Sequence, residues 1–502
     1  MALAPYFHRG ALAAAQVLEG FDESRFQATL EATPVGIAVA EDATCSEANA
    51  LADLLVRLLA RLYPRLAIMG PANSVDSLRQ LAAQVNPAIE LESDATVGVS
   101  IGTLNSPFPT TFYAGSAGWH ALVGQRSPLP IGKSDNPFGP GAAACIAAAN
   151  VFRCVFLPQW QAESDEDVCF CMWSMDTRCE SEHADTTPWH LADEPVLIGI
   201  GAIGNATLWA LARAPAEATI HLVDHEPVEL SNVQRYALTT PDDVGRWKVD
   251  LAAGIAGPGI DLVPHRETLA EYVGEHGYVW DRFLLALDTA SARRSAQAVL
   301  PYWIANAWTQ PGDLGVSVHP YFGGEGACVA CLYLPKEQAQ NEDELVAQSL
   351  RVPHLQGLVR TLLFTGAPVG RDLLEAVAGA VEKPLDLLLP FEGRPIRDLY
   401  VEGFCGGAVI ALGEAGRPPQ DLHVPLAHQS ALAGVMLGAS LIRSSEGGDP
   451  PITSATRVNV LRKLGRDLTV PIRAERDGRC LCDDALYVER YRSKYARAAP
   501  PG

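Results

Sequence analysis

Short apolar runs alternate with longer stretches of helical spacing along the first third of the chain. The runs PVGIAVA and RLAIMG suit buried strands, and SEANALADLLVRLLARLY between them has the spacing of an amphipathic helix. The strand-like pieces VGVSIGTL, TTFYAG and WHALVG follow, and then NPFGPGAAACIAAANVFRCVF, a helix of small residues after a Pro/Gly turn. The pattern predicts an α/β fold for residues 1–160.

A second α/β unit begins near Val196 and is interrupted once. VLIGIGAIGNATLWALARA predicts a buried strand, a glycine turn and a helix, and ATIHLVD and RFLLALD predict further strands. Strands that alternate with helices in this way are typical of βαβ units. Residues 336–405 have mostly helical spacing and resemble an insertion. The pattern resumes with VPLAHQSALAGVMLGASLIR, a second helix of small residues, which indicates two related halves.

An acidic, irregular segment separates the halves. It contains Cys169, Cys171 and Cys179, which we expect to be free thiols, with a metal site as the alternative. The predicted organisation is a first domain over 1–160, a linker over 161–192, a second domain over 193–335 and 406–502, and the insertion over 336–405.

Composition and charge exclude several classes of partner. The formal net charge of the 502 residues is −21, and the sequence lacks a Lys/Arg-rich run, so we do not expect nucleic acid to bind. We find neither a membrane span nor a signal peptide, and we therefore expect a cytoplasmic protein. In that compartment the 11 cysteines are expected to be thiols, metal ligands or nucleophiles rather than disulfides.

A glycine turn carries the first chemical signal. Gly199, Gly201 and Gly204 allow a sharp turn and a close approach to phosphates, which the N-terminus of the following helix also favours. Asp224 ends the next strand, where a ribose-binding acid is placed in dinucleotide folds. Taken alone, these four residues form a dinucleotide-binding fingerprint, for which an NAD enzyme is the default interpretation.

The residues after Asp224 favour a reaction at a phosphate. Asn232, Gln234 and Arg235 follow that strand closely, and Lys248 comes soon after. Cations there stabilise the charge that builds on phosphoryl oxygens when pyrophosphate leaves the α-phosphate of ATP. Asp288 ends a later strand and is a candidate magnesium ligand. The alternative makes the cations surface charges and Asp288 a helix cap.

The run from Gly199 to Asp288 resembles the adenylation domain of ThiF-type adenylyltransferases and ubiquitin-activating enzymes. The resemblance implies binding of ATP and Mg²⁺. One departure is Glu226, where family members often have a second Asp, and we expect little effect from it. The residues that carry the resemblance are Gly199, Gly201, Gly204, Asn205, Asp224, Ser231, Asn232, Gln234, Arg235, Lys248 and Asp288.

Two cysteine pairs fit the same family. GACVACLYLP contains Cys328 and Cys331, and DGRCLCDDALY contains Cys480 and Cys482. Four thiolates can hold a structural zinc ion, and the resemblance implies such a site. The second pair has CxC spacing instead of the usual CxxC. The alternative is two buried and two surface thiols.

Cys405 lies between the two pairs, at the end of the helical insertion. Activating enzymes that pass their substrate to a conjugating enzyme have a nucleophilic cysteine in this interval, and a thiolate attacks an acyl adenylate well. The alternative is a small buried residue, the commonest state of a free cysteine.

The resemblance also explains the first half, which has the α/β pattern without the glycines. In this superfamily a catalytic half pairs with a degenerate one, or two copies form a homodimer. The chain resembles the two-halved activating enzymes of bacterial ubiquitin-like conjugation operons, which serve antiphage defence. The resemblance implies that the protein adenylates the C-terminal tail of a ubiquitin-like protein. It further implies a thioester on Cys405 and transfer of the acyl group to a conjugating-type enzyme.

Three other functions differ from this expectation in testable ways. A sulfur-carrier adenylyltransferase needs no obligatory thioester. An NAD-dependent oxidoreductase binds nicotinamide and has no use for Lys248. A non-catalytic scaffold has no need for the combination of Asp224, Arg235, Lys248 and Asp288.

Overall fold

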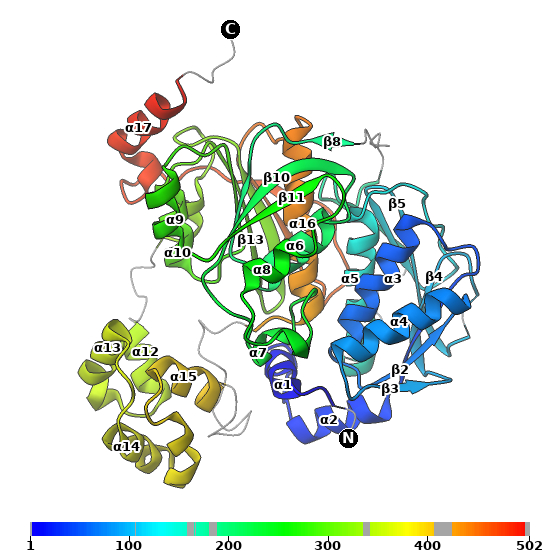
Figure 1. Cartoon of the computed structure of the whole chain (residues 1–502), viewed down its shortest axis with the longest axis horizontal. Coiled ribbons are helices and arrows are strands. Elements are labelled where there is room, and N and C mark those ends of the chain that lie inside the picture. Colours follow the sequence, from blue (N-terminus) through cyan, green and yellow to red (C-terminus); the bar gives the residue numbers. More distant parts are fainter. Residues whose placement is uncertain are drawn as a thin grey trace. The chain divides into compact units, whose positions relative to one another are not determined.

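The computed structural model of the chain divides into two compact units, which are described separately (Figure 1). The larger unit comprises Met1–Tyr6, Thr29–Leu334 and Pro425–Gly502, and the smaller comprises Phe7–Ala28 and Pro335–Val424. The structure describes residues 3–105, 107–157, 165, 167–179, 188–334, 342–405 and 424–496, without the side chains of 401, 402 and 405.

The first half of the larger unit is a seven-stranded sheet of order β3-β2-β1-β4-β5-β6-β7. Strands β3 to β5 in this order are parallel, whereas β6 and β7 are antiparallel to their neighbours. The strands are β1 (Val35–Val39), β2 (Arg65–Met69), β3 (Glu90–Glu92), β4 (Val97–Ile101), β5 (Thr110–Ala117), β6 (His120–Gly124) and β7 (Asp167–Cys171). The helices are α3 (Ser46–Leu59), α4 (Ala72–Val85) and α5 (Phe138–Phe156).

The second half is a nine-stranded sheet of order β11-β10-β9-β12-β13-β14-β15-β16, with β8 (Trp189–His190) paired to β10. Its strands are β9 (Val196–Ile198), β10 (Ala216–Val223), β11 (Ile260–His265), β12 (Arg282–Leu285), β13 (Trp303–Gln310), β14 (Asp313–His319), β15 (Ser454–Val458) and β16 (Thr469–Pro471). The helices are α6 (Ala202–Leu211), α7 (Leu230–Val233), α8 (Lys248–Ala253), α9 (Leu269–His276), α10 (Ala290–Ala298), α11 (Val329–Leu332), α16 (Ala427–Ser445) and α17 (Ala485–Tyr495).

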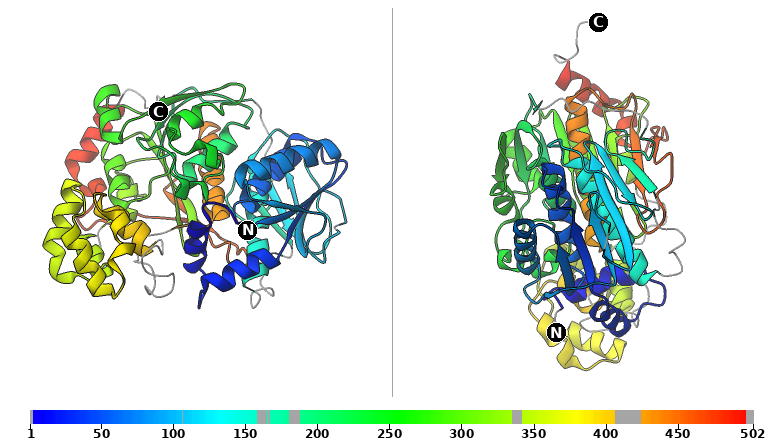
Figure 2. Two further views of the ribbon diagram at one scale, coloured as in Figure 1. Left: turned by 60° about the horizontal axis from the view of Figure 1, so that its bottom comes forward. Right: turned by 90° about the vertical axis from the view of Figure 1, so that its right-hand side faces the viewer.

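The two sheets share one strand order, and Figure 2 shows their strands from two further sides. In the first sheet β1 lies inside, β2 and β3 extend the sheet to one side, and β4 starts the other side. In the second sheet β9, β10, β11 and β12 take the same places. In each, a long helix precedes the last antiparallel section: α5 before β7, and α16 before β15. The expectation of two Rossmann-like α/β halves is therefore confirmed.

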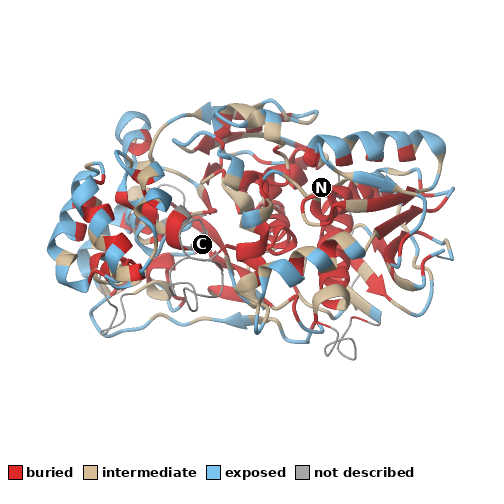
Figure 3. Ribbon diagram, turned by 90° about the horizontal axis from the view of Figure 1, so that it is seen from below, coloured by how far each residue is buried: buried red, intermediate tan, exposed pale blue. Residues whose placement is uncertain are grey.

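Helices α5 and α16 pack against each other and are buried for nearly their whole length (Figure 3). Their small residues also allow both helices to pack closely against α6. A Cβ atom on Gly434 would lie 2.4 Å from the backbone oxygen of Ile203, and one on Gly141 would lie 2.8 Å from the Trp209 ring. Helix α5 is long and apolar enough to cross a membrane by length and composition alone, but 89% of its most apolar window is buried inside the protein.

The predicted helical insertion is confirmed, and it has a core of its own. Buried residues along 346–404 pack together, with Leu350, Val359 and Leu374 fully buried. Asp343 accepts hydrogen bonds from Arg360 Nε at 2.7 Å and Gln356 Nε2 at 3.0 Å. The helices of the smaller unit include α1 (Phe7–Ala15), α12 (Glu342–Ser349), α13 (Gln356–Thr365), α14 (Arg371–Val381), α15 (Ile396–Asp398) and the π-helical turn η6 (Leu399–Cys405).

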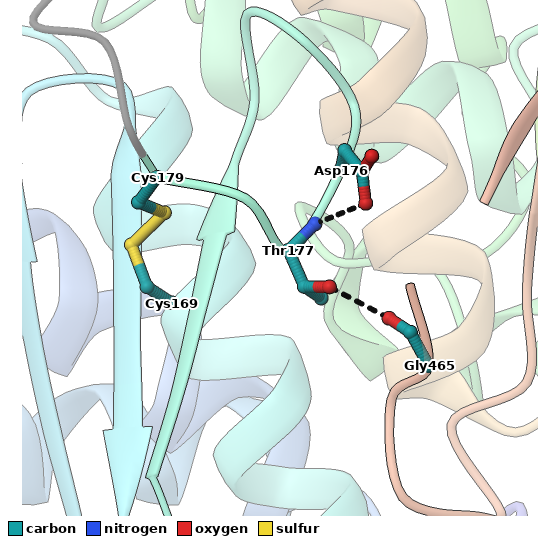
Figure 4. Close-up of a disulfide and its surroundings, with 5 residues drawn as sticks. All are labelled: Cys169, Asp176, Thr177, Cys179 and Gly465. Carbon is teal, nitrogen blue, oxygen red and sulfur yellow. Dashed lines mark hydrogen bonds between the residues drawn. A yellow bond between two sulfur atoms is a disulfide. The ribbon is translucent and has the colours of Figure 1, made fainter. Parts of the chain in front are cut away.

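The expectation of free thiols in the acidic connection is wrong for two of its three cysteines. Cys169 and Cys179 form a disulfide, whereas Cys171 remains a free thiol (Figure 4). Cys169 lies on β7, and a turn after that strand brings Cys179 back beside it. Thr177 Oγ1 in this turn donates to the backbone oxygen of Gly465 at 2.7 Å. The connection therefore completes the first sheet and contacts the end of the chain's second half.

Candidate active site

The glycine turn links β9 to α6, and its conformation requires glycine at two positions. Gly199 has a φ of +91°, and a Cβ there would lie 2.7 Å from the backbone oxygen of Ala286. A Cβ on Gly204 would lie 2.2 Å from the backbone oxygen of Gly199. Gly201 precedes the first residue of α6, so the turn leads directly into a helix N-terminus. Such a terminus favours bound phosphate.

Asp224 holds the turn from the end of β10. Its Oδ2 accepts a hydrogen bond from the backbone N–H of Ile200 at 2.7 Å, and its Oδ1 accepts one from the N–H of Glu226 at 2.9 Å. Strand β10 pairs with β9, so Asp224 and Gly199 follow adjacent strands at the same sheet edge. This is the arrangement expected of a ribose-binding acid beside a phosphate-binding turn.

Lys248 reaches the same edge from the start of α8. The residue is only 5% exposed, and its Nζ lies 2.5 Å from Glu226 Oε2 and 5.6 Å from the centre of the Tyr236 ring. Burial disfavours the charged amine, but Tyr236, Asp224 and Glu226 outweigh it and raise the pKa of Lys248. In turn Lys248 overcomes the effect of burial on Glu226 and lowers the pKa of that carboxyl. The lysine is therefore a buried, permanent cation.

Arg235 and Asp288 are the other two charged residues predicted at this sheet edge. Arg235 donates to the backbone oxygen of Ser231 at 3.1 Å, and its guanidinium carbon lies 5.6 Å from the centre of the Tyr236 ring. Burial lowers the pKa of Arg235, and the attraction of Tyr236, Glu229 and Asp288 opposes that shift. Asp288 is exposed and follows β12, which pairs with β9. Its carboxylate is therefore open to a cation from solvent.

Two of the predicted nucleotide-binding side chains make hydrogen bonds within the protein, and a third is buried. Asn205 Oδ1 accepts a hydrogen bond from the N–H of Leu238 at 2.9 Å, and Asn232 Oδ1 accepts one from the N–H of Glu229 at 3.0 Å. Gln234 is buried and lines a cavity of about 20 Å³ at the boundary with the first half. Asn205 and Asn232 thus support the loop 229–239, whereas Gln234 Oε1 has no hydrogen-bond partner among the described residues. The contact of all three side chains with nucleotide stays a prediction.

Sequence reasoning missed two arginines that reach this loop from the first half. Arg61 Nε donates to the backbone oxygen of Val233 at 3.0 Å, and its NH2 group donates to those of Tyr236 at 2.5 Å and Thr239 at 2.7 Å. Arg57 NH1 donates to the backbone oxygen of Ala237 at 3.1 Å. Both arginines belong to a helical pattern that also fits ordinary surface charge, so their partners could not be found from spacing.

Asp53 on α3 anchors the same boundary. Its Oδ2 accepts from Trp209 Nε1 at 2.7 Å, from Arg57 Nε at 2.9 Å and from Arg213 NH2 at 3.0 Å. Burial would raise the pKa of Asp53, but the two arginines outweigh it and the pKa is lowered. One carboxylate of the first half thus binds helix α6, the helix that follows the glycine turn.

The four predicted zinc ligands come together. Cys331 Sγ lies 3.2 Å from Cys480 Sγ and 3.4 Å from Cys482 Sγ, and Cys328 Sγ lies 3.4 Å from Cys480 Sγ and 3.8 Å from Cys331 Sγ. Sulfurs around a tetrahedral zinc ion, at Zn–S distances of about 2.3 Å, are about 3.8 Å apart. The cluster therefore fits a four-thiolate zinc site, and the CxC spacing of the second pair does not prevent it.

Cys405 is the last residue of η6 in the smaller unit, and its side chain lies outside the described residues. It follows the helices whose buried residues form the core of that unit, and Phe404 beside it belongs to the core. Its role as the nucleophile stays a prediction.

Comparison with protein families decides what this arrangement is. The ThiF family matches residues 191–480, more than half of the chain. The chain belongs to the ThiF family. Residues 38–157 match a second family, prokaryotic E2 family C, which sequence reasoning did not anticipate. The interpretation of this half as a degenerate adenylation domain stays a prediction, although its sheet shares the topology of the ThiF half.

One relative matches the chain over its whole length. The uncharacterized protein y4jF of Sinorhizobium fredii is 41% identical over 516 residues, which cover 100% of this chain and 99% of the relative. Crystal structures of E. coli MccB with MccA-N7isoASN and with ATP are both 13% identical to it, with TM-scores of 0.36. They cover 58% of this chain and 68% and 67% of those chains. A likeness of this size carries no functional inference.

Membership of the ThiF family supports ATP-dependent adenylation of a substrate with Mg²⁺. The glycine turn, Asp224, Arg235, Lys248 and Asp288 all lie in the matched segment. The scaffold alternative does not explain why these residues meet at one sheet edge.

Proposed function

We propose that this protein activates the C-terminal carboxylate of a ubiquitin-like protein with ATP and then holds it as a thioester. The observation that carries the first step is the convergence of a glycine turn, two acids and two cations on one sheet edge. Asp224 binds the turn directly, and Lys248 and Arg235 flank Tyr236 beside it. A hydride transferase does not need a buried and a partly buried cation there.

In the first step a carboxylate oxygen of the ubiquitin-like protein attacks the α-phosphorus of ATP, and pyrophosphate leaves with the electrons of the broken P–O bond. Asp224 binds the ribose, and the turn before α6 faces the phosphates. Arg235 and Lys248 stabilise the charge that grows on the phosphoryl oxygens. Asp288 would hold Mg²⁺, which neutralises phosphate charge when bound. The product is an acyl adenylate.

In the second step the Cys405 thiolate attacks the acyl carbon. A C–S bond forms, the bond from the acyl carbon to the AMP oxygen breaks, and AMP leaves as the anion. The position of Cys405 at the end of the helical unit, in the interval between the two zinc pairs, supports this role. A conjugating-type enzyme then takes the acyl group by thiol exchange.

The family match of the first half supports the same setting. A family described as prokaryotic E2 within one chain with a ThiF domain favours ubiquitin-like conjugation over sulfur transfer. Bacterial operons of this kind serve antiphage defence, and we extend that role to this protein as part of the proposal.

The deciding experiment measures ATP–pyrophosphate exchange by the purified full chain with ubiquitin-like proteins encoded beside its gene. We expect exchange with an intact carrier, none with a carrier that lacks its last residue, and no binding of NAD⁺. Binding of NAD⁺ without binding of ATP would overturn the proposal. Exchange without any thiol-sensitive adduct would replace the thioester step with sulfur-carrier adenylation.

A further inference from the structure

Two histidines and one glutamate form a cluster at the sheet edge that carries Asp224, and the cluster has no part in the proposed reaction. His265 ends β11, Glu267 follows it, and His276 ends α9. One donor atom from each of the three residues lies within 4.8 Å of the other two. The rings of His265 and His276 are 5.0 Å apart, and both pack against the Tyr272 ring at 4.7 Å.

The carboxylate of Glu267 points to a missing partner. Its Oε2 is buried and has no hydrogen-bond partner among the described residues, and the same is true of the neighbouring Tyr272 hydroxyl. A buried carboxylate oxygen without a partner is costly. Neither histidine supplies that partner in this structure, since Glu267 Oε2 has no hydrogen bond to His265 or His276.

A relay of side chains orients His265. Its Nε2 lies 2.9 Å from His221 Nδ1, and His221 Nε2 lies 3.2 Å from Glu194 Oε2. The Nδ1 atom of His265 is therefore the ring nitrogen that this relay leaves for another partner. Metal-binding histidines commonly donate their second ring N–H to a polar group, and this bond fixes the tautomer and the orientation of the ring. Here that group is His221, which Glu194 holds in turn.

We propose that His265, Glu267 and His276 form a second metal site, which binds Zn²⁺ or a similar divalent transition metal. Two imidazoles and one carboxylate are a recurrent ligand set for such ions, with a water molecule in the remaining position. Donors around tetrahedral zinc are about 3.3 Å apart, given Zn–N and Zn–O distances of about 2.0 Å, so a small rotation of the exposed His276 closes the site.

The site has a structural consequence close to Asp224. The backbone N–H of Asp224 donates to the backbone oxygen of His265 at 3.2 Å. A metal ion on His265 and Glu267 therefore fixes the loop that follows β11 next to the predicted ribose acid. The four-cysteine cluster is a separate site, since it uses residues of α11 and of the segment before α17.

The test is the zinc content of the full chain after saturation with Zn²⁺ and removal of unbound metal by gel filtration. Wild type should retain one zinc ion more per chain than His276→Ala and Glu267→Gln, and the Glu267→Gln side chain is isosteric and preserves packing. His190→Ala is the matched control, because His190 is an exposed histidine that pairs with Glu217 outside the cluster. This control should retain the wild-type content.

A second measurement tests the relay. Titration with Zn²⁺ of protein whose four-cysteine site is already filled should give an affinity about 10–100-fold weaker for Glu194→Gln than for wild type. Equal zinc content in wild type, His276→Ala and Glu267→Gln would overturn the proposal. An equal loss in His190→Ala would overturn it as well, since the bound zinc would then not belong to the cluster.

Discussion

The charge on Lys248 is set by its neighbours and opposes the effect of its burial. Desolvation alone would favour the neutral amine, but Tyr236, Asp224 and Glu226 raise its pKa above the ordinary value. Glu226 is more than half exposed, so water can solvate its carboxylate when a phosphate oxygen takes its place beside the lysine. The amine is thus already desolvated and charged before substrate arrives, which is the preorganisation that phosphoryl chemistry requires.

Replacement of Lys248 or Asp288 should therefore abolish the first step without unfolding the protein. We expect Lys248→Ala to lower carrier-dependent pyrophosphate exchange about 10²–10³-fold, the usual cost of one lost transition-state contact. Asp288→Ala should have a comparable effect. Arg246→Ala is the control, since Arg246 is exposed and pairs with Asp243 nearby. Near-normal exchange in both site variants would refute the assignment of the site.

Replacement of Cys405 should separate the two steps. Cys405→Ala should retain pyrophosphate exchange, because the glycine turn and its charges lie elsewhere, but it should form no thiol-sensitive adduct on a non-reducing gel. Cys405→Ser should trap a more stable oxygen ester. Cys154→Ala controls for the loss of a thiol. If Cys405→Ala still forms the adduct, the nucleophile lies elsewhere, and Cys171 is the free thiol of the acidic connection to test next.

At the scale of elements, the sequence predicted what local spacing encodes and missed what depends on distant partners. The strand, turn and helix around Gly199 were predictable because glycine, apolar runs and a terminal Asp have local causes. The disulfide of Cys169 was not, because pairing depends on a turn that returns the chain to β7. The contacts of Arg61 were not predictable either, since they join the turn after α3 to a loop of the other half.

Replacement of Arg61 tests whether the contact between the two halves supports the loop 229–239. Burial lowers its pKa to about 10, so it stays charged at neutral pH, and it donates to four backbone oxygens of the loop that carries Arg235. Arg61→Ala leaves those oxygens unpaired and should lower the free energy of unfolding by about 2–5 kcal/mol. Urea unfolding measures this, and pyrophosphate exchange should fall as the loop loses its support.

A matched control distinguishes this effect from the loss of any arginine. Arg65 is on β2 of the same half and pairs with the partly exposed Glu92, so Arg65→Ala should cost at most about 1 kcal/mol. If Arg61→Ala unfolds like Arg65→Ala and keeps full exchange, the boundary does not position the loop.

At the scale of the whole chain, two sheets of one topology bring their long helices together within the larger unit. Helix α5 of the first half packs on α16 of the second. Asp53 of α3 and Arg61, in the turn after α3, contact the elements around the glycine turn. Two α/β halves of one strand order are thus paired within a single chain. Association of two copies stays a prediction.

The four-cysteine cluster links distant parts of the second half, and its metal should be structural. Cys328 and Cys331 lie at α11, whereas Cys480 and Cys482 lie before α17, and Tyr491 and Tyr495 of that helix belong to the same buried cluster. Without the metal ion, the link between the two cysteine pairs is lost.

We expect Cys480→Ser to lose one zinc per chain and to lower the thermal midpoint, while His276→Ala keeps this ion. A zinc-free protein with an unchanged midpoint would contradict the assignment, and Cys145→Ser, which alters a buried thiol outside the cluster, controls for the substitution itself.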